Sequence, residues 1–197
     1  MRYTGSKCKR CRAVGAPICG RAKCAIVRNP SPPGQHGAAR KKKSEYAEHL
    51  LEKQRIRWTY DVSEKQFYSV FVEASKSKGV TGIVMLQLLE SRLDNILFRA
   101  NLAGSRAHAR QIISHGHVLM NGKKVSIPSA RTKQGDVIAI AEKSAAFVKA
   151  AHKASFVIPD WLAVDEKNLT ASVSMVPQRE QLDQTFKEQL VIEYYSR

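Results

Sequence analysis

All four cysteines of the chain lie within its first 24 residues, in the pattern Cys8-x2-Cys11-x7-Cys19-x4-Cys24. This spacing can bring four thiolates around one tetrahedral zinc ion. Two disulfides are the alternative, but no apolar run typical of a secretion signal follows Met1, and the surrounding Lys and Arg residues favour thiolates over thiols. We therefore predict one structural zinc ion, bound by these four cysteines in a reducing compartment.

The same segment carries most of the positive charge. The 197 residues include 33 Lys and Arg and 17 Asp and Glu, which gives a formal net charge of +16 at pH 7. Residues 1–44 contain 12 of these bases and no acid, and the prolines and glycines at 29–37 favour a stiff connector. Such an arm is expected to bind a polyanion. The bases that we predict to contact nucleic-acid phosphates are Arg2, Lys7, Lys9, Arg10, Arg12, Arg40, Lys41, Lys42 and Lys43.

A second stretch without acidic residues covers residues 95–135. Ser105 can cap a helix that ends near residue 116, followed by Asn121-Gly122, a strong hairpin signal because both central residues of the turn need positive φ. We expect the bases of this helix and hairpin to form one surface suited to a double-helical RNA backbone; ordinary surface charge is the alternative. The residues assigned to this surface are Arg106, Arg110, His117, Lys123 and Lys124.

The spacing of apolar residues predicts three further helices. The first follows Ser44 and carries an apolar stripe at Ala47, Leu50, Leu51 and Trp58. The second follows a capping box at 63–66 and extends to about residue 76, and the third begins near residue 81 and continues or restarts through 93–100. Strands are predicted at 118–120, 123–125, 136–140 and near 169–175, and residues 190–192 form a terminal apolar segment.

Two broad classes of function find no support in the sequence. No apolar stretch approaches the roughly 18 residues that a membrane-spanning helix needs. We find no glycine-rich phosphate loop, no nucleophile elbow and no suitably placed pair of acids. We therefore expect a protein that is not an enzyme, with neither a membrane nor a small-molecule substrate among its partners.

Several motifs together resemble one known family. They are ESRLDN at 90–95, SRAHARQIISHGHVLMNG at 105–122, PPGQHG at 32–37 and the closing QLVIEYYSR at 189–197. The chain resembles, nearly end to end, the zinc-bearing variant of the bacterial-type S4 family of small-subunit ribosomal proteins. The resemblance implies an α+β fold, with a zinc-binding basic arm at 1–44, a mainly helical domain formed by 45–92 with 178–197, and an inserted α/β RNA-binding domain with its helix–hairpin module at 93–177.

The resemblance also implies a function. Members of this family are structural constituents of the small ribosomal subunit, where they bind ribosomal RNA early and clamp a helical junction in its 5′ domain. They lie near the messenger RNA entry path beside ribosomal protein S5, and messenger RNA is a further candidate partner. We add Arg55, Arg57 and Arg92 to the expected RNA contacts. The expected location is the ribosome of the cytoplasm, with the plastid stroma left open.

Two alternatives compete with this interpretation. Helix–hairpin modules like residues 99–140 also occur in pseudouridine synthases, but such an enzyme needs a further catalytic domain with an acidic nucleophile, for which the chain has no room. A zinc-containing DNA-binding regulator would place a recognition helix after the cysteines. Pro30, Pro32 and Pro33 occupy that position instead.

Overall fold

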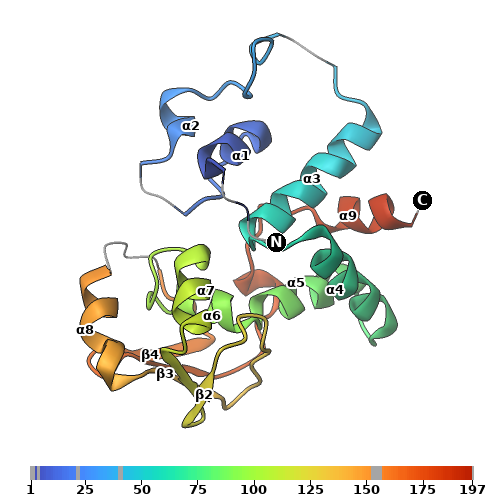
Figure 1. Cartoon of the computed structure of the whole chain (residues 1–197). Coiled ribbons are helices and arrows are strands. Elements are labelled where there is room, and N and C mark those ends of the chain that lie inside the picture. Colours follow the sequence, from blue (N-terminus) through green and yellow to red (C-terminus); the bar gives the residue numbers. More distant parts are fainter. Residues whose placement is uncertain (1–2, 4, 21–22, 40–41, 152–156, 197) are drawn as a thin grey trace. The chain divides into compact units, whose positions relative to one another are not determined.

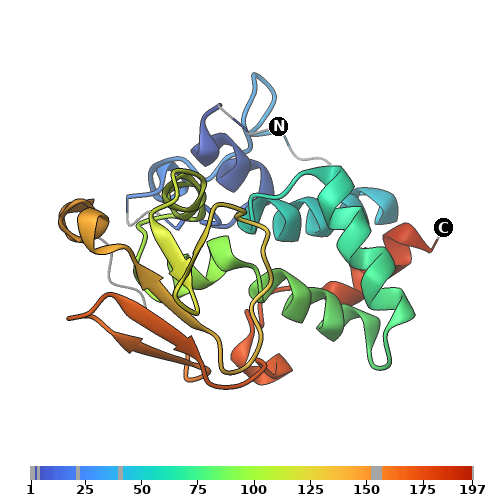
Figure 2. The same cartoon turned by 60° about the horizontal axis from the view of Figure 1, so that its bottom comes forward.

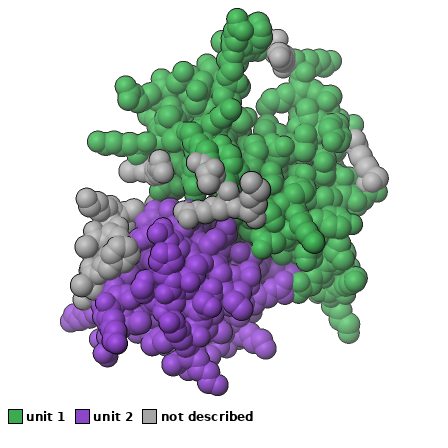
Figure 3. Space-filling model, viewed as in Figure 1, with its two compact units in different colours: residues 1–85, 184–197 green, residues 86–183 purple. Residues whose placement is uncertain are grey.

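The computed structural model describes residues 3, 5–20, 23–39, 42–151 and 157–196 (Figure 1). The chain divides into two compact units, which Figure 3 colours separately: Met1–Met85 with Gln184–Arg197, and Leu86–Asp183. The division differs from the predicted boundaries at 92 and 178. Residues 90–92 belong to the second unit because Glu90 and Arg92 bond there to Asn95, Arg99 and Asp94.

The first unit is helical. Ser44 caps its longest helix by accepting a hydrogen bond from the Ala47 amide, and Ser63 forms the predicted capping box with Gln66. Both predicted helix starts are therefore confirmed. The helices are α1 (Lys7–Val14), α2 (Ala25–Arg28), α3 (Glu45–Thr59), α4 (Glu64–Lys76), the first half of α5 (Thr81–Glu90), and α9 (Glu188–Tyr195), which packs along α3.

Helix α3 buries a different face from the one predicted. The expected apolar stripe is only half-buried. The buried positions are instead His49, Glu52, Lys53 and Ile56. Three of these four side chains are polar, so hydrophobic periodicity was a wrong guide to this helix.

Partners from other elements make this polar face suitable for burial. Lys53 Nζ donates to Glu64 Oε1 over 2.7 Å, and the backbone amide of Lys187 donates to Glu52 Oε1 over 3.0 Å. His49 Nε2 lies 3.1 Å from Glu193 Oε2. Buried polar groups are tolerated when they are hydrogen-bonded, and here the bonds connect α3 to α4 and to the C-terminal segment.

The second unit combines helices with an antiparallel sheet in the order β2-β1-β3-β5-β4, whose strands run from yellow to orange-red in Figures 1 and 2. The predicted α+β class is confirmed. The helices are α6 (Leu93–Arg99), α7 (Arg106–Ser114), α8 (Glu142–Ala151) and the short 3-10 helix η1 (Arg179–Gln181). The strands are β1 (Val118–Met120), β2 (Lys123–Val125), β3 (Val137–Ile140), β4 (Leu162–Asp165) and β5 (Thr170–Val173).

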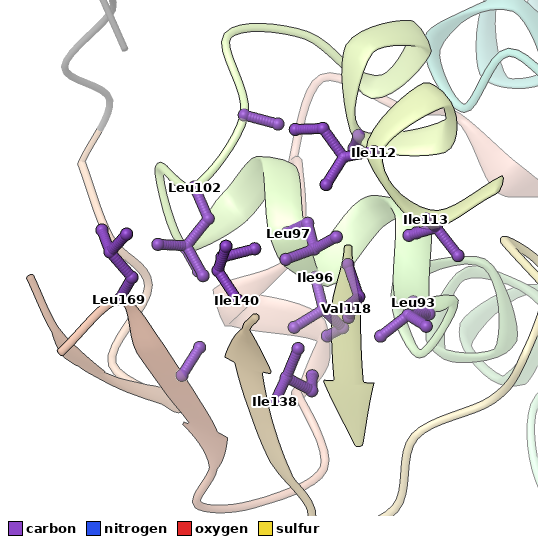
Figure 4. Close-up of a cluster of buried hydrophobic side chains, with 14 of the residues drawn as sticks. Leu93, Ile96, Leu97, Leu102, Ile112, Ile113, Val118, Ile138, Ile140 and Leu169 are labelled. Carbon is purple, nitrogen blue, oxygen red and sulfur yellow. The ribbon is translucent and has the colours of Figure 1, made fainter. Parts of the chain in front are cut away.

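Helices α6 and α7 share one hydrophobic core with the sheet. Figure 4 shows Leu97 of α6 and Ile112 of α7 directed toward Val118 and Ile138 of the strands. Trp161, only 2% exposed, completes this core. The helix that presents the predicted RNA-binding bases is thus held rigidly against the hairpin that follows it.

The hairpin forms as predicted. Val118 pairs with Val125 and Met120 with Lys123, and the two turn residues Asn121 and Gly122 have φ values of 53° and 77°. A turn with two positive φ angles matches the right-handed twist of the flanking strands.

None of the helices in the described residues is long and apolar enough to cross a lipid bilayer.

Asp136 holds the hairpin turn in place, which makes the turn sensitive to pH. Asn121 Nδ2 donates to Asp136 Oδ1 over 2.8 Å and the Lys133 amide donates to Oδ2 over 2.7 Å. These two bonds, of which the one from Asn121 has the larger effect, lower the pKa of Asp136 below its ordinary value of 3.8. The ionised carboxylate therefore contributes its full stabilisation when the pH is above the ordinary pKa of 3.8. This contribution is lost as the pH falls through the lowered pKa of the folded protein.

We therefore expect the Asp136 carboxyl carbon to titrate below pH 3.8 in an NMR experiment. Replacing Asn121 by alanine should move this midpoint up toward the ordinary value, because the largest stabilising bond is removed. A midpoint at or above 3.8 in the unchanged chain would contradict this account of the turn.

Candidate nucleic-acid interface and cysteine cluster

The four cysteines come together in the first unit. Helix α1 carries Cys8 and Cys11, and Cys24 is the N-cap residue of α2. The Sγ atoms of Cys8, Cys19 and Cys24 all lie within 4.8 Å of one another, and the thiol of Cys11 bonds to those of Cys19 and Cys24. The sulfur atoms of Cys8, Cys19 and Cys24 therefore lie close together, and Cys11 lies beside them.

The close approach of three cysteines suits a metal site. Around one zinc ion with Zn–S distances of about 2.3 Å, sulfur atoms are about 3.8 Å apart, which is compatible with the 4.8 Å limit that Cys8, Cys19 and Cys24 satisfy. None of these cysteines, all within described parts of the chain, forms a disulfide. Burial raises the pKa of the Cys11 thiol to about 12, with further contributions from Cys19 and Cys24.

Cys24 behaves differently from Cys11. Burial acts to raise the pKa of its thiol, but hydrogen bonds from the Ile26 amide and from the neighbouring thiols outweigh burial and lower it. The thiolate of Cys24, the form that binds metal, is therefore favoured more than that of an ordinary cysteine.

Several bases of the N-terminal arm bind other parts of the protein. Lys7 and Arg10 each lie 3.4 Å from a carboxylate oxygen of Asp61, and the Arg10 guanidinium covers the Tyr3 ring at 3.6 Å. Arg12 Nε donates to the Ser31 carbonyl over 2.8 Å, which ties α1 to the proline-rich connector. These three bases have structural contacts in addition to any contact with RNA.

Other bases of the arm are exposed. Lys9, Lys42 and Lys43 have exposed side chains. The predicted contacts Arg2, Arg40 and Lys41 lie outside the described residues. In α3, Arg55 donates to Thr185 Oγ1 over 2.8 Å, and Arg57 lies 3.3 Å from Glu64.

The arginines of α7 have internal partners in the second unit. Arg106 is 8% exposed and its Nε donates to Asn95 Oδ1 over 2.8 Å. Arg110 Nη2 donates to Asp94 Oδ2 over 2.6 Å, and the same carboxylate accepts two bonds from Arg92. The expectation that Arg106 and Arg110 both face solvent is therefore wrong for Arg106, because Asn95 at the start of the acid-free stretch draws it inward.

The lysines of the hairpin remain on the surface. Lys123 and Lys124 of β2 are exposed. A Cβ placed on Gly116 would lie 2.2 Å from Lys124 Cε, so the Lys124 side chain lies directly across this glycine. Gly116 has a φ of +74°, which brings the end of α7 and the hairpin close together.

A surface pocket lies next to Gly116, the glycine that the Lys124 side chain crosses. It has a volume of about 310 Å³ and is lined by His108, Gln111, Ile112, His115 and His117. Ser144 Oγ and His117 Nδ1 are 2.7 Å apart, so a hydrogen bond to α8 orients the His117 ring. Of these residues, only His117 is among the RNA contacts predicted from the sequence. The spacing of residues 108, 111 and 115, which places all three on one face of a helix, was the signal available for the others.

Comparison with known proteins gives a consistent result along the chain. A family model described as the ribosomal protein S4/S9 N-terminal domain matches residues 2–90, and one described as the S4 domain matches residues 91–138. A Gloeobacter violaceus protein named small ribosomal subunit protein uS4 is 49% identical over 204 residues, covering 100% of this chain and 99% of the relative. A Thermus thermophilus protein of the same name is 47% identical over 208 residues, with the same coverage.

Proposed function

This chain belongs to the S4 family of small-subunit ribosomal proteins, and from that premise we propose that it is a structural constituent of the small subunit that binds ribosomal RNA directly. The observation that carries the proposal is the position of the exposed lysines. Lys123 and Lys124 lie on a rigid hairpin within the S4 domain match, in a 41-residue stretch without an acid. Exposed bases without neighbouring acids favour binding of a phosphate backbone.

The finer proposal is that the protein clamps a helical junction in the 5′ domain of the RNA during assembly. Each unit carries its own exposed bases: Lys9, Lys42 and Lys43 in the first, and Lys123 and Lys124 in the second. Two separate basic surfaces support binding to more than one RNA helix. A position near the messenger RNA path and beside protein S5 is part of the same proposal, as is the division into arm, helical domain and inserted RNA-binding domain.

We also propose that Cys8, Cys11, Cys19 and Cys24 bind one structural zinc ion. The donor set is that of a closed site, in which four thiolates leave no position for substrate. The metal would cross-link α1 and α2 and so present the bases of the arm in a fixed arrangement. The family consists of structural ribosomal proteins and not of enzymes, so no catalytic role is assigned.

The test is a binding measurement across a salt series, using a 5′-domain ribosomal RNA and an unrelated structured RNA of equal length. We expect clear preference for the first. Replacing Lys123 and Lys124 together by alanine should weaken binding and reduce the slope of log affinity against log salt by about 1.4 to 1.8, since each phosphate contact contributes about 0.7 to 0.9.

The matched control is Lys167→Ala, because Lys167 is an exposed lysine of the same unit that lies in the turn between β4 and β5. This variant should keep the affinity and slope of the unchanged chain. Equal binding to both RNAs, or an unchanged slope in the double variant, would contradict the proposal.

A further inference from the structure

The pocket beside the hairpin differs chemically from the phosphate-binding surface around it. Its lining contains one apolar side chain, Ile112, which is 1% exposed, together with three histidines and Gln111. A phosphate group would need charged donors, whereas apolar and aromatic side chains suit the face of an aromatic ligand. The described lining contains no Lys or Arg.

The pocket also has the size and the polar groups that a nucleobase requires. A volume of about 310 Å³ lies within the usual range for small-ligand sites and accommodates one base with part of its ribose. An amide such as that of Gln111 offers both a donor and an acceptor, which matches the edge of a base. Gln111 and His115 are exposed, so the pocket is accessible from solvent.

Neighbouring groups are arranged to receive the rest of the nucleotide. Ser144, itself 6% exposed, bonds to His117 Nδ1 and so sets the orientation of one wall. Lys124 crosses Gly116 between His115 and His117, which places an ammonium group next to the pocket. A base inserted in the pocket would therefore have a cation close to its phosphate.

We propose that the pocket lined by His108, Gln111, Ile112, His115 and His117 binds one unstacked nucleobase of ribosomal RNA. This inference rests on the proposed function and deepens it, because it adds recognition of a base to the contacts with phosphates. Unstacked bases in RNA loops and junctions are the usual targets of such aromatic sites. His115 stacks on the base, and Gln111 bonds to its edge.

The proposal is tested with the full-length chain and the 5′-domain RNA across the same salt series, at pH 8, where free imidazole is neutral. His115→Ala should lower the affinity by about 5- to 150-fold, the loss expected for one stacked base. Gln111→Ala should lower it by a similar factor of about 5 to 150, the loss expected for a bidentate bond to a base edge. Their salt slopes should equal that of the unchanged chain, because a neutral contact releases no counterions. His115→Phe keeps a stacking ring and should bind within about twofold of the unchanged chain.

Ser114→Ala is the matched control, since Ser114 is exposed at the end of the same helix and does not line the pocket. Thermal unfolding of every variant checks that the fold is retained. Dimethyl sulfate probing of the RNA should reveal one base that the unchanged chain protects and the Gln111→Ala complex does not.

Three results would overturn the assignment to a base. One is a reduced salt slope in the pocket variants, which would identify a phosphate site. The second is unchanged affinity in Gln111→Ala and His115→Ala. The third is equal weakening by His115→Phe and His115→Ala. Lack of preference for the 5′-domain RNA by the unchanged chain would instead overturn the proposed function, so the two failures are distinguishable.

Discussion

Removal of the proposed zinc ion from the cysteine cluster is expected to unfold α1 and α2 while the remaining helices stay folded. Among the described residues before Glu45, the buried hydrophobic side chains are those of Cys11 and Cys24 alone, so this segment has almost no apolar core. A structural zinc site contributes about 10 to 16 kcal/mol of apparent binding free energy, which is far more than such a segment obtains from burial. Hydrogen exchange after chelation should show loss of protection in α1 and α2.

The control for this experiment is internal. Helix α4 buries Phe67, Val70 and Ala74, and its amides should keep their protection when the metal is removed. Cys11→Ser should reproduce the effect of chelation, whereas Ser6→Ala should not, because the Ser6 side chain makes no capping bond. Purified protein with disulfides and without one zinc per chain would rule out the zinc proposal.

The second large effect is expected in the buried charge cluster of the second unit. Asp94 is 1% exposed, and its carboxylate accepts bonds from Arg92 and Arg110 at distances from 2.6 to 3.1 Å. Asp94→Ala leaves the buried guanidinium of Arg92 without its counter-ion. The loss of one partner of a buried pair costs about 3 to 5 kcal/mol. Urea denaturation should show a decrease of this size in the free energy of unfolding.

Glu166→Ala provides the comparison, because Glu166 is an exposed acid in the turn between β4 and β5. Its replacement should change the free energy of unfolding by no more than about 0.5 kcal/mol. In the Asp94→Ala background, Arg92→Met should recover part of the lost stability, since it removes the uncompensated charge. A decrease below about 1 kcal/mol for Asp94→Ala would contradict the expectation that Arg92 depends on Asp94 as its buried counter-ion.

Local signals predicted the main elements well. The caps at Ser44, Ser63 and Ser105 and the Asn121-Gly122 turn all form as expected, because each depends on bonds between residues within a few positions of one another. Helices α1, α2, α8 and α9, the short helix η1 and strand β4 were not predicted. In α1 the cysteines and bases leave no apolar stripe that periodicity could detect.

The candidate site was predicted in part. The cysteines were identified from their spacing, and three of them meet the distance expected for one metal ion. The hairpin lysines are exposed, as an RNA-binding surface requires. The sequence did not predict the pocket. Its lining includes residues of α7 and also His117, which follows the helix, and these residues form a pocket because α7 packs on the sheet.

The sequence by itself determined where helices begin, where the hairpin turns and which segments are strongly basic, since these properties depend on neighbours along the chain. Tertiary structure decided which bases remain available for RNA. Arg110 finds its counter-ion 16 positions away and Arg10 finds Asp61 51 positions away, whereas Lys123 and Lys124 stay exposed. The physical reason is that ion pairing depends on distance in space. The sequence therefore gives the total charge of a basic segment, but not how many of its bases form ion pairs with acids of the same chain.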